Sequence, residues 1–184
     1  MALQATVHRF EVTLSDVDRG VYETLDLRVA RHPSESVRYL LLRLLAYALS
    51  YEEGIAFSKG GLSSTDDPPV VVHDRTGVLL AWIDVGVPAA ERLHKAAKAA
   101  RRVVIFTETD PQRLRKDARA RGGVHRADEI EIVSIPAALL SELEPHVERH
   151  VKLELSRNDG VLYVTIAGKI YEATLATSNL GAEP

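Results

Sequence analysis

The sequence predicts a single α/β domain over residues 1–184, with a mixed β-sheet flanked by helices. Strand-like and helix-like segments alternate through the middle of the chain, which implies crossover connections between parallel strands. A two-residue hydrophobic alternation at both ends of the chain predicts antiparallel hairpins. The 184 residues are 46% hydrophobic, which is enough for one substantial core. No internal repeat or low-complexity linker divides them.

The N-terminal third begins with two strands and continues into a helix. The stretches 5–16 and 21–30 alternate hydrophobic and polar residues on either side of the turn VDRG. Residues 31–54 then carry a hydrophobic stripe at helical spacing, with Pro33 in the first turn and Gly54 at the end. Further leucines make this helix hydrophobic nearly all round, which predicts that it packs on more than one side.

Alternating strands and helices make up the remainder of the chain. The predicted elements are strands over 70–74 and 78–86, a helix over 88–102, a strand over 103–109, a helix over 110–123, a strand over 129–135, a helix over 136–150 and a three-stranded meander over 151–175. The first strand pair turns through DRTG, where Gly77 suits a positive φ. Asp110 is the expected N-cap of its helix. Asn158-Asp159-Gly160 is the expected first turn of the meander.

The composition excludes several classes of protein. The chain has no cysteine, so disulfides, zinc fingers and thiol nucleophiles are ruled out. No hydrophobic stretch approaches the ~20 residues of a membrane span, and the first ten residues lack the hydrophobic run of a signal peptide. We therefore expect a soluble cytoplasmic protein that does not enter a membrane. The sequence does not set the oligomeric state, although the edges of the terminal strands are open to pairing.

The net charge of −3 conceals an uneven distribution. Residues 91–126 contain eleven Lys or Arg and four Asp or Glu, a net charge of +7, while the rest of the chain carries −10. A basic block inside an acidic protein is typical of a surface that binds phosphates. It is equally typical of the solvated side of two surface helices, and the sequence leaves both interpretations open.

Asp84 ends a strand of large hydrophobic residues, where an ionised carboxylate needs a partner. With a two-residue loop, the hairpin register places Asp67 opposite Asp84, with Cβ atoms roughly 5 Å apart. A bulge at Gly77 would bring Asp66 onto that face instead. Two neighbouring carboxylates repel each other unless a cation lies between them. Such oxygen ligands suit Mg²⁺, or Mn²⁺ in its place.

Two more charged residues can complete such a site. Glu35 is predicted in the first turn of the N-terminal helix, and Lys95 lies one helix length beyond Asp84. In metal-assisted hydrolysis of a phosphodiester, the ion polarises the phosphate and acidifies water, while an ammonium group orients the hydroxide. Three acids and one lysine are the smallest set of side chains that this reaction requires.

Several blocks of this sequence resemble the YaeQ family of bacterial proteins. They are MALQATVHRF, RVARHPSESVRYLLLRLLAY, TDDPPV, AWIDVGVP and RLHKAAKAA, in this order. The resemblance covers the first hundred residues densely and the remainder more loosely. It implies a variant of the restriction-endonuclease-like fold of the PD-(D/E)xK nuclease superfamily, in which a helix acid, a strand acid and a (D/E)xK motif surround one or two Mg²⁺ ions.

The resemblance also implies roles for particular residues. Glu35 would be the helix acid, Asp67 or Asp66 the strand acid, and Asp84 the acid of the third strand. The carbonyl of the following residue, Val85, would be a further ligand.

One position departs from the superfamily pattern, because Gly86 stands where the lysine is usual. Lys95 on the following helix would then supply the ammonium group. The basic block would guide a nucleic-acid backbone into the site without base specificity. Six residues of this block are expected to contact the nucleic acid: Arg92, Lys98, Arg101, Arg102, Arg113 and Lys116.

These inferences lead to the hypothesis of Mg²⁺-dependent phosphodiester hydrolysis in nucleic acid. One alternative is a non-catalytic module that keeps the fold and binds nucleic acid or a protein, and another is a protein-binding adaptor that uses the terminal meander. Both acids also have an ordinary structural interpretation. Glu35 would cap the helix, because the helix dipole favours an acid in the first turn, and Asp84 would belong to the loop that enters the next helix. Trp82 is expected to face away from Asp84, into the core.

Overall fold

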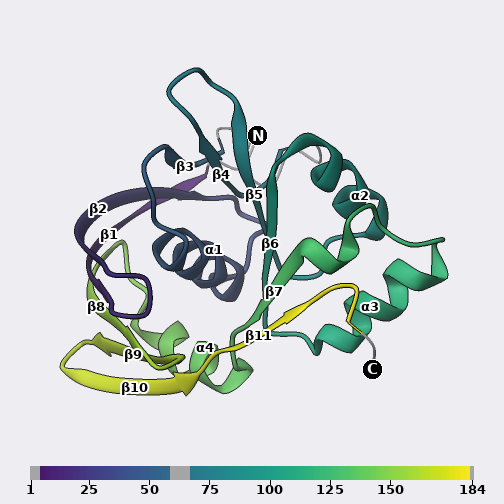
Figure 1. Cartoon of the computed structure of the whole chain (residues 1–184). Helices are drawn as coiled ribbons and strands as arrows, with labels where there is room; N and C mark the ends of the chain where they lie inside the picture. The colour runs from purple at the N-terminus through teal and green to yellow at the C-terminus, as the bar shows by residue number, and fades with distance from the viewer. Residues whose placement is uncertain (1–4, 59–66, 183–184) are drawn as a thin grey trace. The chain divides into compact units, whose positions relative to one another are not determined.

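The computed structural model describes residues 5–58 and 67–182, which form an α/β structure with two mixed sheets (Figure 1). The backbone clusters into two compact units, and each unit is discontinuous in sequence. Unit 1 contains the residues up to Leu44 together with Ile135–Leu175. Unit 2 contains Leu45–Ser134 and the residues from Ala176 onward.

Unit 1 is built on a five-stranded sheet in the order β10-β9-β8-β1-β2. Its strands are β1 (Thr6–Asp16), β2 (Val21–Arg31), β8 (His150–Asn158), β9 (Val161–Ile166) and β10 (Lys169–Thr174). The N-terminal hairpin and the C-terminal meander form as predicted, but they do not end a common central sheet. Instead they join each other, because β1 pairs in parallel with β8. Local periodicity gives strand positions, but it does not say which distant strand is the partner.

The strands of this sheet alternate between a buried and an exposed face. On β1, Phe10, Val12 and Leu14 are buried, and β8 and β9 contribute further buried hydrophobic residues at every second position. This alternation is what a sheet with one face toward a core and one toward water requires. The exposed face therefore carries polar residues such as Arg9, Glu11 and Asp26.

The turns at one end of this sheet are fixed by an aspartate. The Asp18 carboxylate, in the turn between β1 and β2, accepts hydrogen bonds from the backbone N–H groups of Asp159 at 2.7 Å and Gly160 at 2.9 Å. Those two residues have positive φ angles of 49° and 74°, as a tight hairpin turn requires. The two backbone donors lower the pKa of Asp18, so the carboxylate joins both turns in its ionised form.

The first helix, α1 (Val37–Leu49), begins later than predicted. The Ser36 hydroxyl accepts from the backbone N–H of Tyr39 at 3.1 Å and so caps the helix. Glu35 consequently lies in the turn that precedes α1, and its prediction in the first helical turn is wrong. The helix is buried all round from Leu40 to Leu49, as its hydrophobic composition predicts, and it crosses the boundary between the two units.

The helix α4 (Ala137–Leu143) is shorter than the predicted segment 136–150. A 3₁₀ turn (Glu144–His146) follows it, and β8 begins at His150. Pro145 has no backbone N–H to continue the helical hydrogen bonds, which accounts for the early end.

Unit 2 contains a six-stranded sheet in the order β11-β7-β6-β5-β4-β3. Its elements are β3 (Ile55–Phe57), β4 (Val70–His73), β5 (Leu79–Val85), α2 (Ala90–Ala99), β6 (Arg102–Thr107), α3 (Pro111–Ala120), a 3₁₀ turn (Ala127–Glu129), β7 (Ile130–Ser134) and β11 (Ala176–Asn179). The parallel strands β5, β6 and β7 are connected by α2 and α3, which lie on the same face of the sheet (Figure 1). The predicted crossover units are thus confirmed, whereas β3 and β11 were not predicted.

Helix α3 starts as predicted, since the Asp110 carboxylate accepts from the backbone N–H of Gln112 at 2.9 Å. Beneath the helices, the core of unit 2 includes Trp82, Leu93 and Ile105. No helix in the described ranges is long and hydrophobic enough to cross a membrane.

Candidate functional site

Asp84 lies near the end of the central strand β5 and is 2% exposed. Its carboxylate oxygen Oδ2 accepts a hydrogen bond of 2.7 Å from the indole Nε1 of Trp82. The expectation that Trp82 faces away from Asp84 is therefore wrong, because residues two apart in a strand share a face. The buried acid thus has a neutral hydrogen-bond donor on its own strand.

The charge of Asp84 is paired with Arg92 of helix α2. The Arg92 Nε lies 3.0 Å from both carboxylate oxygens, and its Nη2 lies 2.9 Å from Oδ1. The same Nη2 donates to the backbone carbonyl of Asp67 at 2.8 Å, and the guanidinium lies 5.4 Å from the ring centre of Trp82. A cationic group of the protein itself therefore occupies the position between the oxygens of Asp84 and Asp67.

Burial and pairing act on Asp84 in opposite directions. Desolvation raises the pKa of Asp84 above its ordinary value, while the hydrogen bonds and charge of Arg92 and the Trp82 donor act against that rise. An ionised carboxylate at this depth depends on such partners. Arg92 was expected to contact nucleic acid, and its position beside Asp84 gives it a different role in this structure.

The hairpin that carries Asp67 and Asp84 has a different register from both predicted ones. Val70 pairs with Ile83, and a bulge shifts the register between Val72 and His73. By extension of this register, Asp84 faces the position of Pro69, two residues beyond Asp67. Asp66, the other predicted partner, lies outside the described residues.

The loop of this hairpin explains the shift. The Asp74 carboxylate accepts from the backbone N–H groups of Thr76 at 2.8 Å and Val78 at 2.9 Å. The Asp74 N–H donates to the Val78 carbonyl, and Gly77 has a φ of 87°, as predicted. The turn is consequently longer than the two-residue loop from which the predicted register was counted.

Glu35 belongs to unit 1 and forms an ion pair with Arg43. Its Oε1 lies 2.8 Å from Nε of Arg43, its Oε2 lies 3.1 Å from Nη2, and the two side chains are 1% and 4% exposed. Oε2 also accepts from the backbone N–H of His32. Burial raises the pKa of Glu35, and Arg43 opposes the rise. Both oxygens of the Glu35 carboxylate therefore accept hydrogen bonds from residues near it in the sequence.

The described residues do not fit a magnesium site as they are arranged. Both oxygens of Asp84 and of Glu35 already accept hydrogen bonds from an arginine. Within residues 5–58 and 67–182, no three His, Asp or Glu side chains lie close enough together to hold a metal ion. Lys95, the expected ammonium group, is exposed on α2, one turn beyond Arg92.

The other five basic residues that were expected to contact nucleic acid fall into two groups. Arg102 forms an ion pair with Glu52. Among the residues that the structure describes, the remaining four make no ion pair, and all four are exposed: Lys98, Arg101, Arg113 and Lys116. Arg113 and Lys116 line a hollow of about 460 Å³ between α3 and the segment 87–89, which connects β5 to α2. Asp117 also lines this hollow, and its carboxylate is paired with Arg121. Unit 2 thus presents cations without partners beside the loop that follows Asp84.

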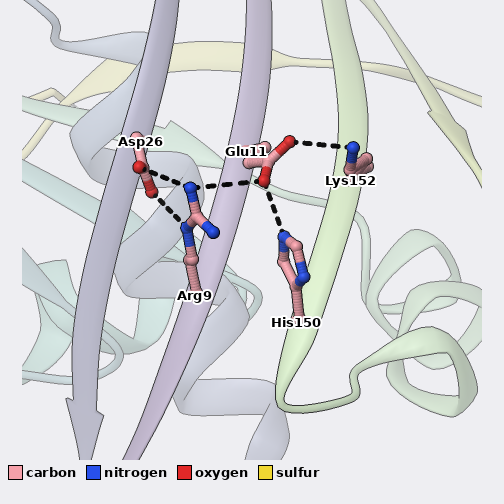
Figure 2. Close-up of polar contacts among 5 residues, drawn as sticks. All are labelled: Arg9, Glu11, Asp26, His150 and Lys152. Atoms are coloured by element: carbon pink, nitrogen blue, oxygen red, sulfur yellow. Dashed lines mark hydrogen bonds and ion pairs between the residues drawn. The ribbon is translucent and has the colours of Figure 1, made fainter.

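A second polar centre lies on the exposed face of the five-stranded sheet, around Glu11 (Figure 2). Its carboxylate lies 2.7 Å from His150 Nε2, 3.2 Å from Lys152 Nζ and 3.4 Å from Arg9. Arg9 also donates two hydrogen bonds of 2.8 Å to Asp26. His150 and Lys152 hold the pKa of Glu11 below its ordinary value. In this network the two acids, Glu11 and Asp26, balance the two permanent cations, Arg9 and Lys152. A hollow of about 630 Å³ adjoins the network.

Comparison with known proteins gives a family. The family model described as YaeQ protein matches residues 1–175. The relative named "Uncharacterized protein YaeQ" in Escherichia coli (strain K12) is 38% identical over 108 residues, which are 58% of this chain and 59% of that protein's length. The relative of the same name in Salmonella typhi is 28% identical over 176 residues, covering 95% of this chain and 96% of that protein.

Two solved structures share the fold. The crystal structure of the YaeQ protein from Pseudomonas syringae has a TM-score of 0.84 at 30% identity and covers 97% of both chains. The YaeQ protein structure from Xanthomonas axonopodis pv. citri has the same score and identity, covering 94% of this chain and 97% of that one. The α/β arrangement with mixed sheets is therefore that of solved YaeQ structures. This chain belongs to the YaeQ family.

Proposed function

We propose that this YaeQ-family protein binds the phosphate backbone of nucleic acid and does not cut it. The observation that supports the proposal is the set of four exposed cations without acidic partners within the described part of unit 2. A cation that is already paired gains little from a phosphate, whereas an unpaired one gains a charge-assisted contact and releases a counterion from the nucleic acid. Arg113 and Lys116 also line a hollow, where a phosphate can approach two cations from one side.

The environment of Asp84 supports a non-catalytic role. A metal-dependent nuclease needs open carboxylate oxygens, and those of Asp84 are engaged by Arg92 and Trp82. Contacts to phosphates carry no sequence information, so the expected partner is DNA or RNA bound without base preference.

The proposal predicts a measurable salt dependence. We expect the double variant Arg113→Ala/Lys116→Ala to bind nucleic acid more weakly and to lower the slope of log K against log salt by about 1.8 for duplex DNA, because each phosphate contact contributes about 0.9. Fluorescence anisotropy with a labelled duplex at several salt concentrations measures this slope.

Lys169→Ala is the matched control, since Lys169 is an exposed lysine on β10 of the other unit. Its slope should equal that of the wild type. If the wild type binds neither DNA nor RNA at low salt, the proposal fails and a protein-binding adaptor becomes the better interpretation.

A second candidate function is Mg²⁺-dependent phosphodiester hydrolysis in a variant of the PD-(D/E)xK fold, with Lys95 as the positioning cation. One observation favours it: oxygen atoms of Asp84 and Asp67, from two segments of chain, converge on one cation position. In the structure the cation is Arg92, so this function requires Arg92 to leave Asp84.

Titration with Mn²⁺ separates the two candidates. We expect calorimetry to detect no Mn²⁺ binding that depends on Asp84, because Arg92 already neutralises this carboxylate. Manganese binds oxygen sites of this kind more tightly than magnesium does and is therefore the more sensitive probe. Binding by the wild type that is lost in a folded Asp84→Asn variant would instead support hydrolysis. It would justify a nuclease assay with Lys95→Ala as a further variant.

A further inference from the structure

The four edges of the two sheets in the described part of the chain differ greatly in length. The edge strands β3, β11 and β10 have 3, 4 and 6 residues, whereas β2 has 11. Short edge strands, prolines, bulges and lysines are the usual protection against edge-to-edge pairing. The β2 strand contains no proline or lysine, and its register with β1 runs without a shift over all 11 pairs. Among the described strands, β2 is thus a long regular edge without proline, lysine or bulge, and its four charged residues, Glu23, Asp26, Arg28 and Arg31, are of both signs.

The hydrogen bonds of β1 show which backbone groups of β2 face the open edge. The N–H of Arg9 donates to Arg149 and that of Val17 donates to Arg157, so both point toward the β8 side of β1. The β2 residue opposite Arg9 is Arg28, whose backbone N–H and C=O therefore point away from β1. By the two-residue period, the same holds for the other even-numbered residues of the strand. Backbone donors and acceptors that point away from β1 thus line the edge.

One end of this edge is covered within unit 1. The Ala30 carbonyl accepts from Nη2 of Arg43 at 2.7 Å, and the Arg31 side chain donates to the Glu35 carbonyl at 2.8 Å. Along the middle of the strand, around Asp26 and Arg28, the outward backbone groups form no hydrogen bond with any residue that the structure describes.

The sequence of β2 complements itself when two copies are aligned antiparallel about Leu27. In this register Asp26 faces Arg28 of the second copy, and Leu25 faces Val29. Asp26 and Arg28 are also the residues whose backbone groups point outward, so their charge pairs coincide with the inter-strand hydrogen bonds. Opposite charges directly across an antiparallel pair are stabilising, and like charges are destabilising.

The two charged residues of this register, Asp26 and Arg28, are exposed. Asp26 is held by Arg9 on its inner side (Figure 2), and its side chain is still 54% exposed. Arg28 is exposed and makes no ion pair with any acid in the described ranges. Arg9 uses two of the acceptor positions of the Asp26 carboxylate, and a carboxylate has about four, so Asp26 can also accept from Arg28 of a second copy.

We propose that β2 is a dimerisation edge, pairing antiparallel with β2 of a second copy of this chain about a twofold axis at Leu27. The interface is isologous, since the same strand contributes both sides. It joins two five-stranded sheets into one of ten strands and does not depend on the proposed nucleic-acid binding.

Complementary charge variants test the dimer. Sedimentation equilibrium should show a wild-type dimer that weakens roughly tenfold to a hundredfold in Arg28→Glu, because two attractive cross-strand pairs become repulsive. Asp26→Lys should also dissociate for the same reason. A mixture of these two variants should form heterodimers, in which every facing pair is again of opposite sign. A structural defect in either variant does not produce such recovery.

Two further variants complete the experiment. Lys169→Glu reverses a charge on the β10 edge and should leave the dimer unchanged. Arg28→Pro removes one outward N–H, which a monomer tolerates at an edge position, and should leave a folded monomer. A wild type that is monomeric at millimolar concentration overturns the proposal, as does a dimer that persists in both Arg28 variants.

Discussion

Replacing Arg43 by methionine is expected to lower the free energy of unfolding by about 3–5 kcal/mol. The guanidinium of Arg43 donates to both carboxylate oxygens of Glu35, and both side chains are almost fully buried. Methionine fills much of the same volume but leaves the acid without its cation. Burial already raises the pKa of Glu35, so the unpaired carboxyl must either stay charged at high cost or take up a proton.

Urea denaturation followed by circular dichroism measures this loss. The double variant Glu35→Gln/Arg43→Met should recover most of the stability, because a neutral amide can still accept from the His32 backbone. Arg75→Met is the matched control, since its ion pair with Glu53 is exposed at both ends and should change stability by less than about 1 kcal/mol. A Glu35→Gln/Arg43→Met variant as unstable as Arg43→Met would attribute the loss to packing and not to charge.

Arg92→Met is expected to cost about 3 kcal/mol at neutral pH, for a similar reason in unit 2. Arg92 is the only guanidinium within hydrogen-bond distance of Asp84 among the described contacts. The expected cost lies at the low end of the range for buried pairs, because the Arg92 side chain is 21% exposed. Asp84→Asn/Arg92→Met removes both charges and should be considerably more stable than the single variant.

The cost of Arg92→Met should depend on pH. Burial raises the pKa of Asp84 in the folded chain above its ordinary value of 3.8, and removing Arg92 raises it further. A group with a raised folded pKa favours the fold in its protonated form, so its ionisation weakens the fold as pH rises through the folded value. The deficit of the variant should therefore be larger at neutral pH and shrink on acidification toward 3.8.

The single tryptophan of the chain offers a direct readout of this titration. Trp82 donates its indole N–H to Asp84, so protonation of the carboxyl should change the fluorescence of Trp82. The midpoint should lie above 3.8 in Arg92→Met, and Asp84→Asn should show no such transition. A deficit that is independent of pH would show that Asp84 stays in one protonation state throughout.

Elements with a local signal were predicted well. The terminal hairpins follow from strict alternation, the Asp110 cap from its position before Pro111, and the Gly77 turn from its need for a positive φ. Each of these depends on neighbours within a few residues. The early end of α4 at Pro145 could also have been predicted in this way, because proline cannot continue the helical hydrogen bonds.

One missed feature depends on long-range pairing, and another depends on a local turn. Nothing in the periodicity of β1 indicates that it pairs with β8, which lies about 140 residues later. The register at Asp84 was missed because the hydrogen bonds of the Asp74 side chain lengthen the turn.

The cations beside the two buried acids were also missed, although one of them had a signal. Arg43 stands inside a run of leucines, and a charge at such a position needs a buried acid. Arg92 carried no comparable signal, since it begins an ordinary basic helix.

The discontinuous arrangement of the units has a consequence for synthesis on the ribosome. The inner edge of β1 has no partner until the chain has been extended through β8, so the five-stranded sheet cannot close while the middle of the protein is being made. Most of unit 2 emerges in one continuous stretch, Leu45–Ser134, and can assemble first, as domains do during elongation. A nascent chain that stops before His150 therefore carries an N-terminal hairpin open on both sides, and completion of β8 ends that exposure.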